Sequence, residues 1–472
     1  MKSSQALLCA LIFGQAVLSS NALSDSWSKY GGNEGHHRAV KDEVQITRSN
    51  VDNLRLLWEK KAPGVTCDPL VVDGVVYWVD WDGGVYANRL DNGREIWTAR
   101  VGRGDKGGGS GTPALVDGYL YTVTHGGLVV KLDADDGRII WRQQINAGPH
   151  IRIYSSPAIA DGVLVIGVSG DGTSKDGIAL DQKILDLWRG SVQGFDTETG
   201  KFLWEFETTR GPEGRLYAGG VSVWSSATID RKRGLAYIGT GNSYNTPASP
   251  YSDSLLALDY RTGKLAWHIQ FTEGDAFRSV TPSGGPDYDV GATPNLFTID
   301  GRDLVGVGDK GSTYYVVDPD RQQVVWQRKL KNGSSLGGIM ASAAYNDGIV
   351  YVSTNNGQID LNYYIFAMEA DTGRVLWDNE TDGFKGIVPV TWANDVIFAG
   401  AGMFRISLGS LRPHISAYDA RNGRLLWQEF MPAPVGGGVT IADGKLVVGY
   451  GLHFQSPTDW EGEGGLRVYG LR

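Results

Sequence analysis

Apolar and polar residues alternate in a phrase that the chain carries seven times. In Ser254–Gln270 (SLLALDYRTGKLAWHIQ) an alternating apolar run is followed by Asp-x-x-Thr-Gly, and a Trp stands four residues after the Gly. Strict alternation indicates half-buried strands, and a polar stretch containing Gly between two such runs indicates a hairpin turn. The equivalent phrases, spaced 44 to 63 residues apart, end at Trp97, Trp141, Trp204, Trp267, Trp326, Trp377 and Trp427.

A second apolar unit precedes each of these phrases. It consists of a short apolar strand, an Asp-Gly or similar turn, and a β-branched strand, as in DPLVVDGVVYWVD from Asp68. Asp-Gly between two alternating runs is a strong hairpin signal. Eight such units are present, and each unit with its following phrase makes four antiparallel strands, which is the content of one propeller blade. The repeat therefore predicts an all-β fold, an eight-bladed β-propeller of four-stranded antiparallel blades.

The two ends of the chain are expected to complete one blade together. The eighth unit finishes with GGLRVYGLR, a third strand that no fourth strand follows. NVDNLRLLWEKKA near the N-terminus has Trp58 where the blade Trp belongs, and residues 33–37 before it are expected to form a turn. Closure by this N-terminal strand covers exposed sheet edges. We therefore expect residues 23–472 to form a single propeller domain whose eight repeated tryptophans pack between blades.

Charge and the first residues narrow the class of protein. The net charge of -9 argues against binding nucleic acid by phosphate neutralisation. Residues 1–22 have the features of a secretory signal: Lys2, an apolar run too short for a membrane span, and Ser20-Asn21-Ala22 before a cut. We expect a secreted or periplasmic protein with no membrane span after cleavage; an uncleaved anchor is the alternative. Cys67 is then the sole cysteine, which excludes an intramolecular disulfide and a multi-cysteine metal site.

Chemistry is expected where the repeats depart from one another. Three lengthened loops, at 170–190, 240–254 and 271–291, come from consecutive blades and carry Asp, Asn and Ser. Loops on one side of a propeller converge over the central channel, so these three are candidates for one shared site. Oxygen-bearing side chains suit a hard cation, although the same residue types are also common in solvated turns. The candidates are Asp186, Asn242, Asp287 and Asp289.

The repeat resembles that of the quinoprotein alcohol dehydrogenases, eight-bladed propellers that use pyrroloquinoline quinone (PQQ). More specific segments are VWSSATIDRKRGLAYIGTGN (Val223–Asn242), FTEGDAF (Phe271–Phe277) and GPDYDVGATPNL, which are most similar to the polyvinyl-alcohol dehydrogenase branch. The resemblance implies oxidation of an alcohol, small or polymeric and by preference secondary. It also implies PQQ and a divalent cation such as Ca²⁺ as cofactors, with an external electron acceptor such as a cytochrome.

The resemblance assigns roles position by position. Trp224 resembles the aromatic floor under the quinone, and Lys310 resembles the cation that contacts the quinone oxygens. Arg189, assigned with them to cofactor binding, resembles the Arg that follows the metal-binding acid, which makes Asp186 a displaced candidate for that acid. The remaining roles are metal ligand for Asn242, extra metal carboxylate for Asp289, and catalytic base, ionised at neutral pH, for Asp287.

One departure from the family keeps other functions open. Many relatives cover the quinone with a ring made by two adjacent cysteines, but the corresponding segment here reads GDKGGGSG (Gly104–Gly111). A propeller that kept the frame and lost the redox reaction would look much the same. The alternatives are a binding or assembly scaffold without redox chemistry, and a secreted biosynthetic enzyme that uses the same channel without quinone.

Overall fold

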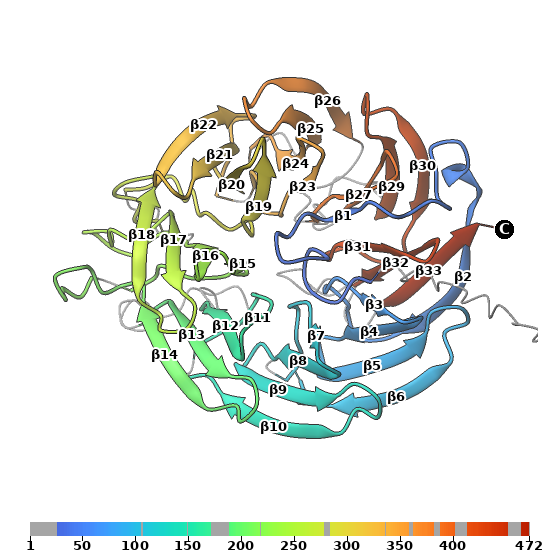
Figure 1. Ribbon diagram of the computed structural model, residues 1–472, viewed down its shortest axis with the longest axis horizontal. Coiled ribbons are helices and arrows are strands. Elements are labelled where there is room, and N and C mark those ends of the chain that lie inside the picture. Colours follow the sequence, from blue (N-terminus) through green and yellow to red (C-terminus); the bar gives the residue numbers. More distant parts are fainter. Residues whose placement is uncertain are drawn as a thin grey trace, which may run out of the picture.

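The eight predicted blades form a closed ring around a central channel (Figure 1). The structure is a computed structural model that describes residues 26–104, 107–148, 150–170, 188–217, 219–277, 284–335, 337–357, 362–381, 388–401, 413–451 and 464–471. The eight-bladed, all-β prediction is confirmed, and the signal expected at 1–22 lies outside the described residues. None of the helical structure in these ranges is long and apolar enough to cross a membrane.

Each of the first six blades is built from four strands that are consecutive in the chain, and pairing is antiparallel throughout. The bounds of the first three blades are β3 (Leu70–Val72), β4 (Val75–Val79), β5 (Gly84–Arg89), β6 (Glu95–Arg100); β7 (Ala114–Val116), β8 (Tyr119–Val123), β9 (Leu128–Asp133), β10 (Ile139–Gln144); and β11 (Ala158–Ala160), β12 (Val163–Val168), β13 (Ser191–Asp196), β14 (Phe202–Glu207). The next three are β15 (Thr228–Asp230), β16 (Leu235–Gly239), β17 (Ser254–Asp259), β18 (Leu265–Gln270); β19 (Asn295–Ile299), β20 (Arg302–Gly308), β21 (Thr313–Asp318), β22 (Gln323–Lys329); and β23 (Ala344–Asn346), β24 (Ile349–Asn355), β25 (Tyr363–Glu369), β26 (Val375–Thr381).

The last two blades recruit strands from the N-terminal part of the chain. The seventh consists of β27 (Thr391–Ala393), β28 (Val396–Ala401), β29 (His414–Asp419) and β30 (Leu425–Phe430), with β1 (Ala39–Val40) added parallel to β27. The eighth consists of β31 (Val439–Ala442), β32 (Lys445–Tyr450), β33 (Gly465–Leu471) and β2 (Leu54–Lys61), which follows the short helix η1 (Val51–Asn53). β2 pairs with β33, so the expected closure by the N-terminal strand is confirmed.

The repeated Trp and the repeated turn Gly pack against each other between neighbouring blades. Gly93, in the last turn of the first blade, has φ +70°, and a Cβ there would overlap the Trp58 ring of the eighth blade. The Trp58 Nε1–H donates to the carbonyl of Leu90, three residues before that Gly, at 2.8 Å. The same docking recurs in the pairs Gly137 and Trp97, Gly200 and Trp141, Gly263 and Trp204, Gly373 and Trp326, and Gly423 and Trp377.

The fifth blade departs from this pattern. Its last turn has Gln322, at φ +55°, where the other turns have Gly. Trp267 is the tryptophan that the repeat assigns to this turn, and its indole N–H has no acceptor among the described residues. A buried N–H without a partner costs about 1–3 kcal/mol. The seam between the fourth and fifth blades, next to the lengthened loops, therefore lacks, among the described residues, the indole hydrogen bond that the six Trp–Gly seams have.

Side chains at the hub link the innermost strands of successive blades. The Asp68 N–H donates to Thr112 Oγ1 at 2.8 Å, and the Thr112 N–H donates to Ser156 Oγ at 2.9 Å. The chain of bonds continues from the Ser156 N–H to Ser226 Oγ and from the Ser226 N–H to Thr293 Oγ1. One hydroxyl from each of the second to fifth blades, accepting a backbone N–H of the preceding blade, therefore joins the first five blades edge to edge.

The segment Trp27–Val40, called the hub segment below, lies inside the ring rather than serving only as a turn before the closure strand (Figure 1). Its main chain bonds to the innermost strands of five blades. The carbonyls of Ser28, Gly35, His37 and Arg38 accept N–H groups of β7, β19, β23 and β27, and Trp27 forms a bridge with Val71 of β3.

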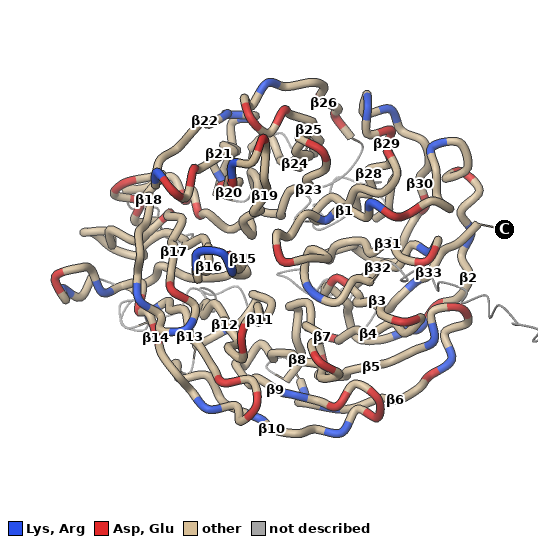
Figure 2. The backbone as a smooth tube through the Cα atoms, in the orientation of Figure 1, with Lys and Arg blue, Asp and Glu red and all other residues tan. Residues whose placement is uncertain are grey.

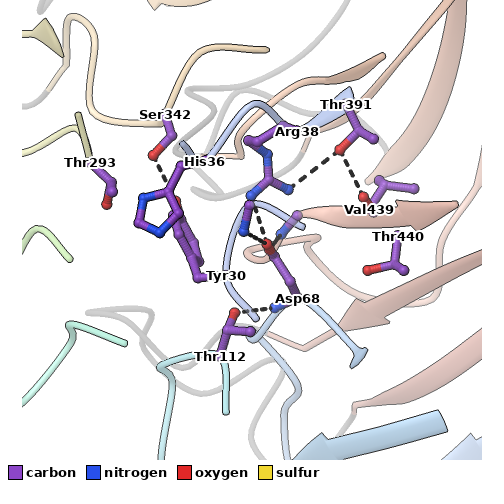
Figure 3. A network of polar contacts seen from close by, with 12 residues as sticks. Tyr30, His36, Arg38, Asp68, Thr112, Thr293, Ser342, Thr391, Val439 and Thr440 are labelled. Atoms are coloured by element: carbon purple, nitrogen blue, oxygen red, sulfur yellow. Dashed lines mark hydrogen bonds and ion pairs between the residues drawn. The ribbon is translucent and has the colours of Figure 1, made fainter. Parts of the chain in front are cut away.

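Arg38 anchors the hub segment (Figure 3). Its guanidinium is fully buried and donates to Asp68 Oδ2 at 2.6 Å and to the Val390 carbonyl at 3.1 Å. The Tyr30 hydroxyl of the same segment bonds to Ser342 Oγ at 2.8 Å. A buried guanidinium is tolerated because a carboxylate and carbonyls satisfy it. Along the backbone, acidic and basic residues are intermixed, and many of them fall in the outer strands and the turns (Figure 2).

Candidate active site

A cavity of about 320 Å³ lies at the hub, and residues of all eight blades line it. Its size falls in the usual range for small-molecule sites. Trp81 of the first blade, Trp224 of the fourth, and Asp289 and Lys310 of the fifth contribute side chains to the lining. Tyr30 of the hub segment also lines it, so this segment forms part of the cavity floor.

Five candidate residues come from the same edge of two neighbouring blades: Trp224, Asp289 and Lys310 line the cavity, and Asn242 and Asp287 lie behind them, hydrogen-bonded to Asp289 and Lys310. Asn242 follows β16 and Lys310 follows β20, whereas Trp224 precedes β15, and Asp287 and Asp289 precede β19. In each blade the first two strands are antiparallel, so the start of the first and the end of the second lie on one face. Five residues that are widely separated in the sequence therefore come together.

Asp289 is the centre of this group. Its Oδ2 lies 2.8 Å from Lys310 Nζ and accepts the Trp224 indole N–H at 3.2 Å, and its Oδ1 accepts the Asn242 backbone N–H at 2.8 Å. Lys310 Nζ also donates to both carboxylate oxygens of Asp287 at 3.2 Å. One ammonium thus serves two carboxylates, and both carboxylates are more than nine-tenths buried.

The Trp224 ring packs against Gly291 and lies near the Lys310 ammonium. Lys310 Nζ lies 5.8 Å from its ring centroid, and a Cβ on Gly291 would overlap the indole. The ring faces the cavity with an ammonium beside it, a combination that suits a flat anionic ligand.

The side chain of Asn242 is fixed by two hydrogen bonds. Its Nδ2 donates to the carbonyls of Ser243 and Phe277, each at 2.7 Å. Both amide hydrogens are thereby used, which leaves Oδ1 as the atom of this side chain that can accept a bond or bind a cation. This is the atom that the expected role as a metal ligand requires.

Burial dominates the acid–base chemistry of the site. Burial raises the pKa of Asp287 to about 7, the Lys310 charge opposes this shift, and the Asp289 charge adds to it. Burial by itself would lower the pKa of Lys310, but the two carboxylates outweigh burial and hold it above its ordinary value. With this pKa, Asp287 is partly protonated at neutral pH, whereas the ordinary pKa of an aspartate would leave it fully ionised, as expected from the sequence.

Two further buried carboxyls lie next to this group. Asp275 is fully buried, and burial raises its pKa although the backbone N–H groups of Tyr288 and Asp287 lower it. Asp253 is also fully buried, and neither of its carboxylate oxygens has a hydrogen-bond partner among the described residues. Burial, followed by the charges of Asp289 and Asp275, raises the pKa of Asp253 well above its ordinary value.

The site holds an excess of acidic groups. Among the described residues, Lys310 is the cation whose charge acts on Asp253, Asp275 and Asp287, and it also pairs with Asp289. Full ionisation of these four carboxyls would therefore leave negative charge that no described cation compensates in a buried region. Protonation or a bound cation resolves this excess. In the described part of the chain, no three Asp, Glu, His or Cys side chains converge closely enough to hold a metal ion by themselves.

Of the remaining expected site residues, one lies apart from this group and one lies outside the described residues. Arg189 lies 3.4 Å from Glu207 and donates to the Tyr217 carbonyl at 3.0 Å, and the cavity lining does not include it. Asp186 lies outside the described residues. Arg189 therefore bonds within the third blade and the loop that follows it, and the role of Asp186 stays a prediction.

Residues that the motif comparison did not single out also contribute to the site. Trp81 lines the cavity beside Ser110 and Gly111, in the region where a cysteine pair is missing, and its indole N–H donates to Thr66 Oγ1 at 2.7 Å. Asp275 stands in the segment FTEGDAF, whose resemblance to the family was the available signal. Asp253 had no such signal, because it looks like an ordinary turn aspartate.

Known families match parts of the chain. The family model described as glucose/ethanol/alcohol dehydrogenase, beta-propeller domain, with the label PQQ, matches residues 144–323. A second model, described as outer membrane protein assembly factor BamB, matches residues 309–448.

Individual relatives agree with the first of these models. A polyvinylalcohol dehydrogenase of Pseudomonas is 32% identical over 337 residues, which is 60% of this chain and 51% of that protein. A polyvinylalcohol dehydrogenase of Sphingopyxis is 30% identical, over 51% of this chain and 41% of that protein. The chain thus spans about half the length of the curated relatives it matches. The structure of the quinohemoprotein alcohol dehydrogenase ADHIIG of Pseudomonas putida superposes with a TM-score of 0.76, at 20% identity over 95% of this chain and 80% of that chain.

Proposed function

We propose that this chain, which belongs to the family of PQQ-dependent alcohol dehydrogenases, oxidises an alcohol in the hub cavity with PQQ bound against Trp224. The observation that carries the proposal is the convergence of an indole, an ammonium and the Asp289 carboxylate on one cavity, with the buried Asp287 carboxylate bonded to the same ammonium. Indole, lysine and carboxylate provide a stacking surface, an electrophilic contact and a base, respectively.

The residues present fit PQQ, which is a flat aromatic quinone with carboxylate groups. Trp224 offers the stacking face, and Lys310 Nζ lies beside that face where it can donate to a quinone oxygen. Ser110, Ser169 and Ser222 line the same cavity and provide hydroxyl groups for the polar edge of the ligand. When bound, PQQ supplies a two-electron acceptor for the hydride of the carbinol carbon.

A divalent cation such as Ca²⁺ would bind between Asn242 Oδ1 and Asp289, with Asp186 as a further candidate ligand. The support is chemical: the amide oxygen of Asn242 is left available, and the carboxyls described around it outnumber the Lys310 ammonium, the cation described there. Hard cations prefer such oxygen ligands. The cation would also compensate the buried negative charge and lower the pKa of Asp287 from about 7.

Asp287 is the proposed base. It removes the hydroxyl proton of the alcohol while the hydride leaves the carbinol carbon, so that a carbonyl product forms. Its buried carboxylate is fixed by Lys310, and the Lys310 charge, together with that of a bound cation, lowers its pKa and favours the ionised form that accepts a proton at neutral pH. The chain therefore supplies orientation, charge compensation and one proton acceptor.

The names of the relatives favour a secondary alcohol as substrate, small or polymeric. Electrons would pass to an external acceptor, such as a cytochrome. We propose that residues 1–22 are a signal, that residues 23–472 are one propeller domain, and that the protein acts outside the cytoplasm.

The proposal is tested by reconstituting the purified protein with PQQ and Ca²⁺ and following dye reduction with a panel of primary and secondary alcohols. We expect Asp287→Asn to lower kcat by at least about 100-fold, the scale of lost general-base catalysis, while PQQ binding measured by dialysis stays near that of the parent. A parent protein that binds no PQQ and reduces no dye would contradict the proposal. A non-redox assembly scaffold, which the match of residues 309–448 to the BamB model favours, would then be the better candidate.

A further inference from the structure

Asp275 has no assigned part in the oxidation, but its side chain is bonded to the backbone that carries the proposed base. The Asp287 N–H donates to Asp275 Oδ1 at 3.2 Å, and the Tyr288 N–H donates to Asp275 Oδ2 at 2.8 Å. Each oxygen of one carboxylate therefore holds one of two successive amides. The side chain is fully buried, so water does not compete for these bonds.

The backbone at Asp287 needs such support. Its φ of +63° is in the left-handed region, which is unfavourable for a residue with a side chain. A strained residue keeps this conformation when the surrounding bonds determine it. Gly285 allows the close approach, because a Cβ there would overlap Asp275 Oδ1.

The main chain of the same segment reaches the loop of Asn242. The Ser243 N–H donates to the Asp275 carbonyl at 3.1 Å, and Ser243 forms a parallel bridge with Ala276. Ser243 directly follows Asn242, the proposed metal ligand. Asp275 thus bonds to both arms of the site: its side chain to the loop of the base, and its main chain to the loop of the amide ligand.

We propose that Asp275 is a positioning residue for the oxidation. Its carboxylate holds the Asp287–Tyr288 backbone so that the Asp287 carboxylate stays 3.2 Å from Lys310 and in register with Asn242. The positioning role rests on the proposed function of Asp287 as base, whereas the bonds between Asp275 and the two amides do not depend on it.

The test compares Asp275→Asn with a matched control, Asp318→Asn. The asparagine has one acceptor oxygen, and its NH₂ would face one of the two amides. Asp318 is also buried and also accepts two backbone N–H groups, those of Asp320 at 3.0 Å and Arg321 at 2.9 Å. It is the last residue of β21, before the turn to β22, on the outer strands of the fifth blade. Both N–H groups bond to Oδ1, an acceptor that asparagine keeps, so the control isolates the loss of a buried carboxylate charge without touching the base.

The first measurement is amide hydrogen exchange in the quinone-free protein. In Asp275→Asn we expect the amides of Asp287 and Tyr288 to exchange at least about 10-fold faster than in the parent, which corresponds to losing one charge-assisted hydrogen bond. Asp318→Asn leaves these two amides unchanged. Unchanged exchange of both amides in Asp275→Asn would contradict the proposal.

The second measurement is the kinetics of alcohol oxidation by the reconstituted protein. We expect Asp275→Asn to lower kcat at least about 10-fold with KM within about threefold, because a displaced base affects the chemical step more than substrate binding. Asp318→Asn keeps the kcat and KM of the parent. If the parent oxidises no alcohol, the proposed function is wrong; if the parent is active and Asp275→Asn keeps its kcat, the positioning role alone is wrong.

Discussion

Replacing Asp253 by asparagine should stabilise the protein, and by more at each higher pH. The side chain is fully buried beside Asp289 and Asp275, and neither of its oxygens has a hydrogen-bond partner in the described residues. Asparagine has nearly the same shape, cannot ionise, and tolerates the left-handed backbone at this position, where φ is +48°. The substitution therefore removes a buried charge without leaving a cavity.

The sign follows from the pKa shift. Burial raises the pKa of Asp253 in the folded protein, so the folded state keeps a proton that the unfolded state releases above its pKa near 3.9. As the pH rises from that value through the folded pKa, the free energy of unfolding of the parent falls by about 1.4 kcal/mol per pH unit on account of this one group. Asp253→Asn lacks this loss, so the difference between variant and parent grows by the same amount per unit.

The assay is urea unfolding at pH 4, 5, 6 and 7 in the presence of a chelator, which keeps cations from compensating the carboxylate. Asp73→Asn is the control, because Asp73 has almost the same backbone, φ +50°, in an exposed hairpin turn. It measures the gain from asparagine in the left-handed region alone. A gain for Asp253→Asn that is equal at pH 4 and pH 7, or no larger than that of Asp73→Asn, would refute the reasoning.

Three further predictions concern the base, the hub and the blade seams. Lys310→Met should move the midpoint of the pH profile of kcat to higher pH, because the Lys310 charge lowers the pKa of Asp287. An unchanged midpoint would show that Lys310 does not set the pKa of the base. Arg38→Met should cost about 3–5 kcal/mol in urea unfolding, since it leaves the buried Asp68 carboxylate without its ion-pair partner, whereas the exposed Arg374→Met should cost less than about 1 kcal/mol. Gln322→Gly should raise the free energy of unfolding by about 1 kcal/mol, because it removes a left-handed glutamine where six other turns have glycine; a loss of stability would argue that the glutamine side chain has a role of its own.

The blades could be predicted because their signals are local. An Asp-Gly pair specifies a hairpin between adjacent strands. A Trp at a fixed distance from a turn Gly specifies packing between neighbouring blades, which is seen for Trp58 and Gly93 and in five further pairs. The path of the hub segment could not be predicted, because it bonds through main-chain groups that carry no residue pattern. Its side-chain contacts, such as those of Arg38 with Asp68 and of Tyr30 with Ser342, join residues 30 and 312 positions apart in the sequence.

The site divides in the same way. Trp224, Asn242, Asp287, Asp289 and Lys310 stand in motifs of the repeat edges, so the ring geometry alone brings them together. Asp253 and Asp275 look like turn residues in the sequence, and only burial distinguishes them from solvated aspartates. Arg189 follows its motif, but its side chain is directed to Glu207.

The pairing of β2 with β33 has a consequence for how the molecule is made. The strand that completes the eighth blade is synthesised before the first blade, and its partner is the last strand of the chain. A ribosome adds about 5–20 residues per second, so the edge of β2 stays unpaired for many seconds, until β33 has been synthesised. A chain without the eight or so terminal residues lacks β33, so the edge of β2 is never covered and we expect the chain to aggregate rather than assemble.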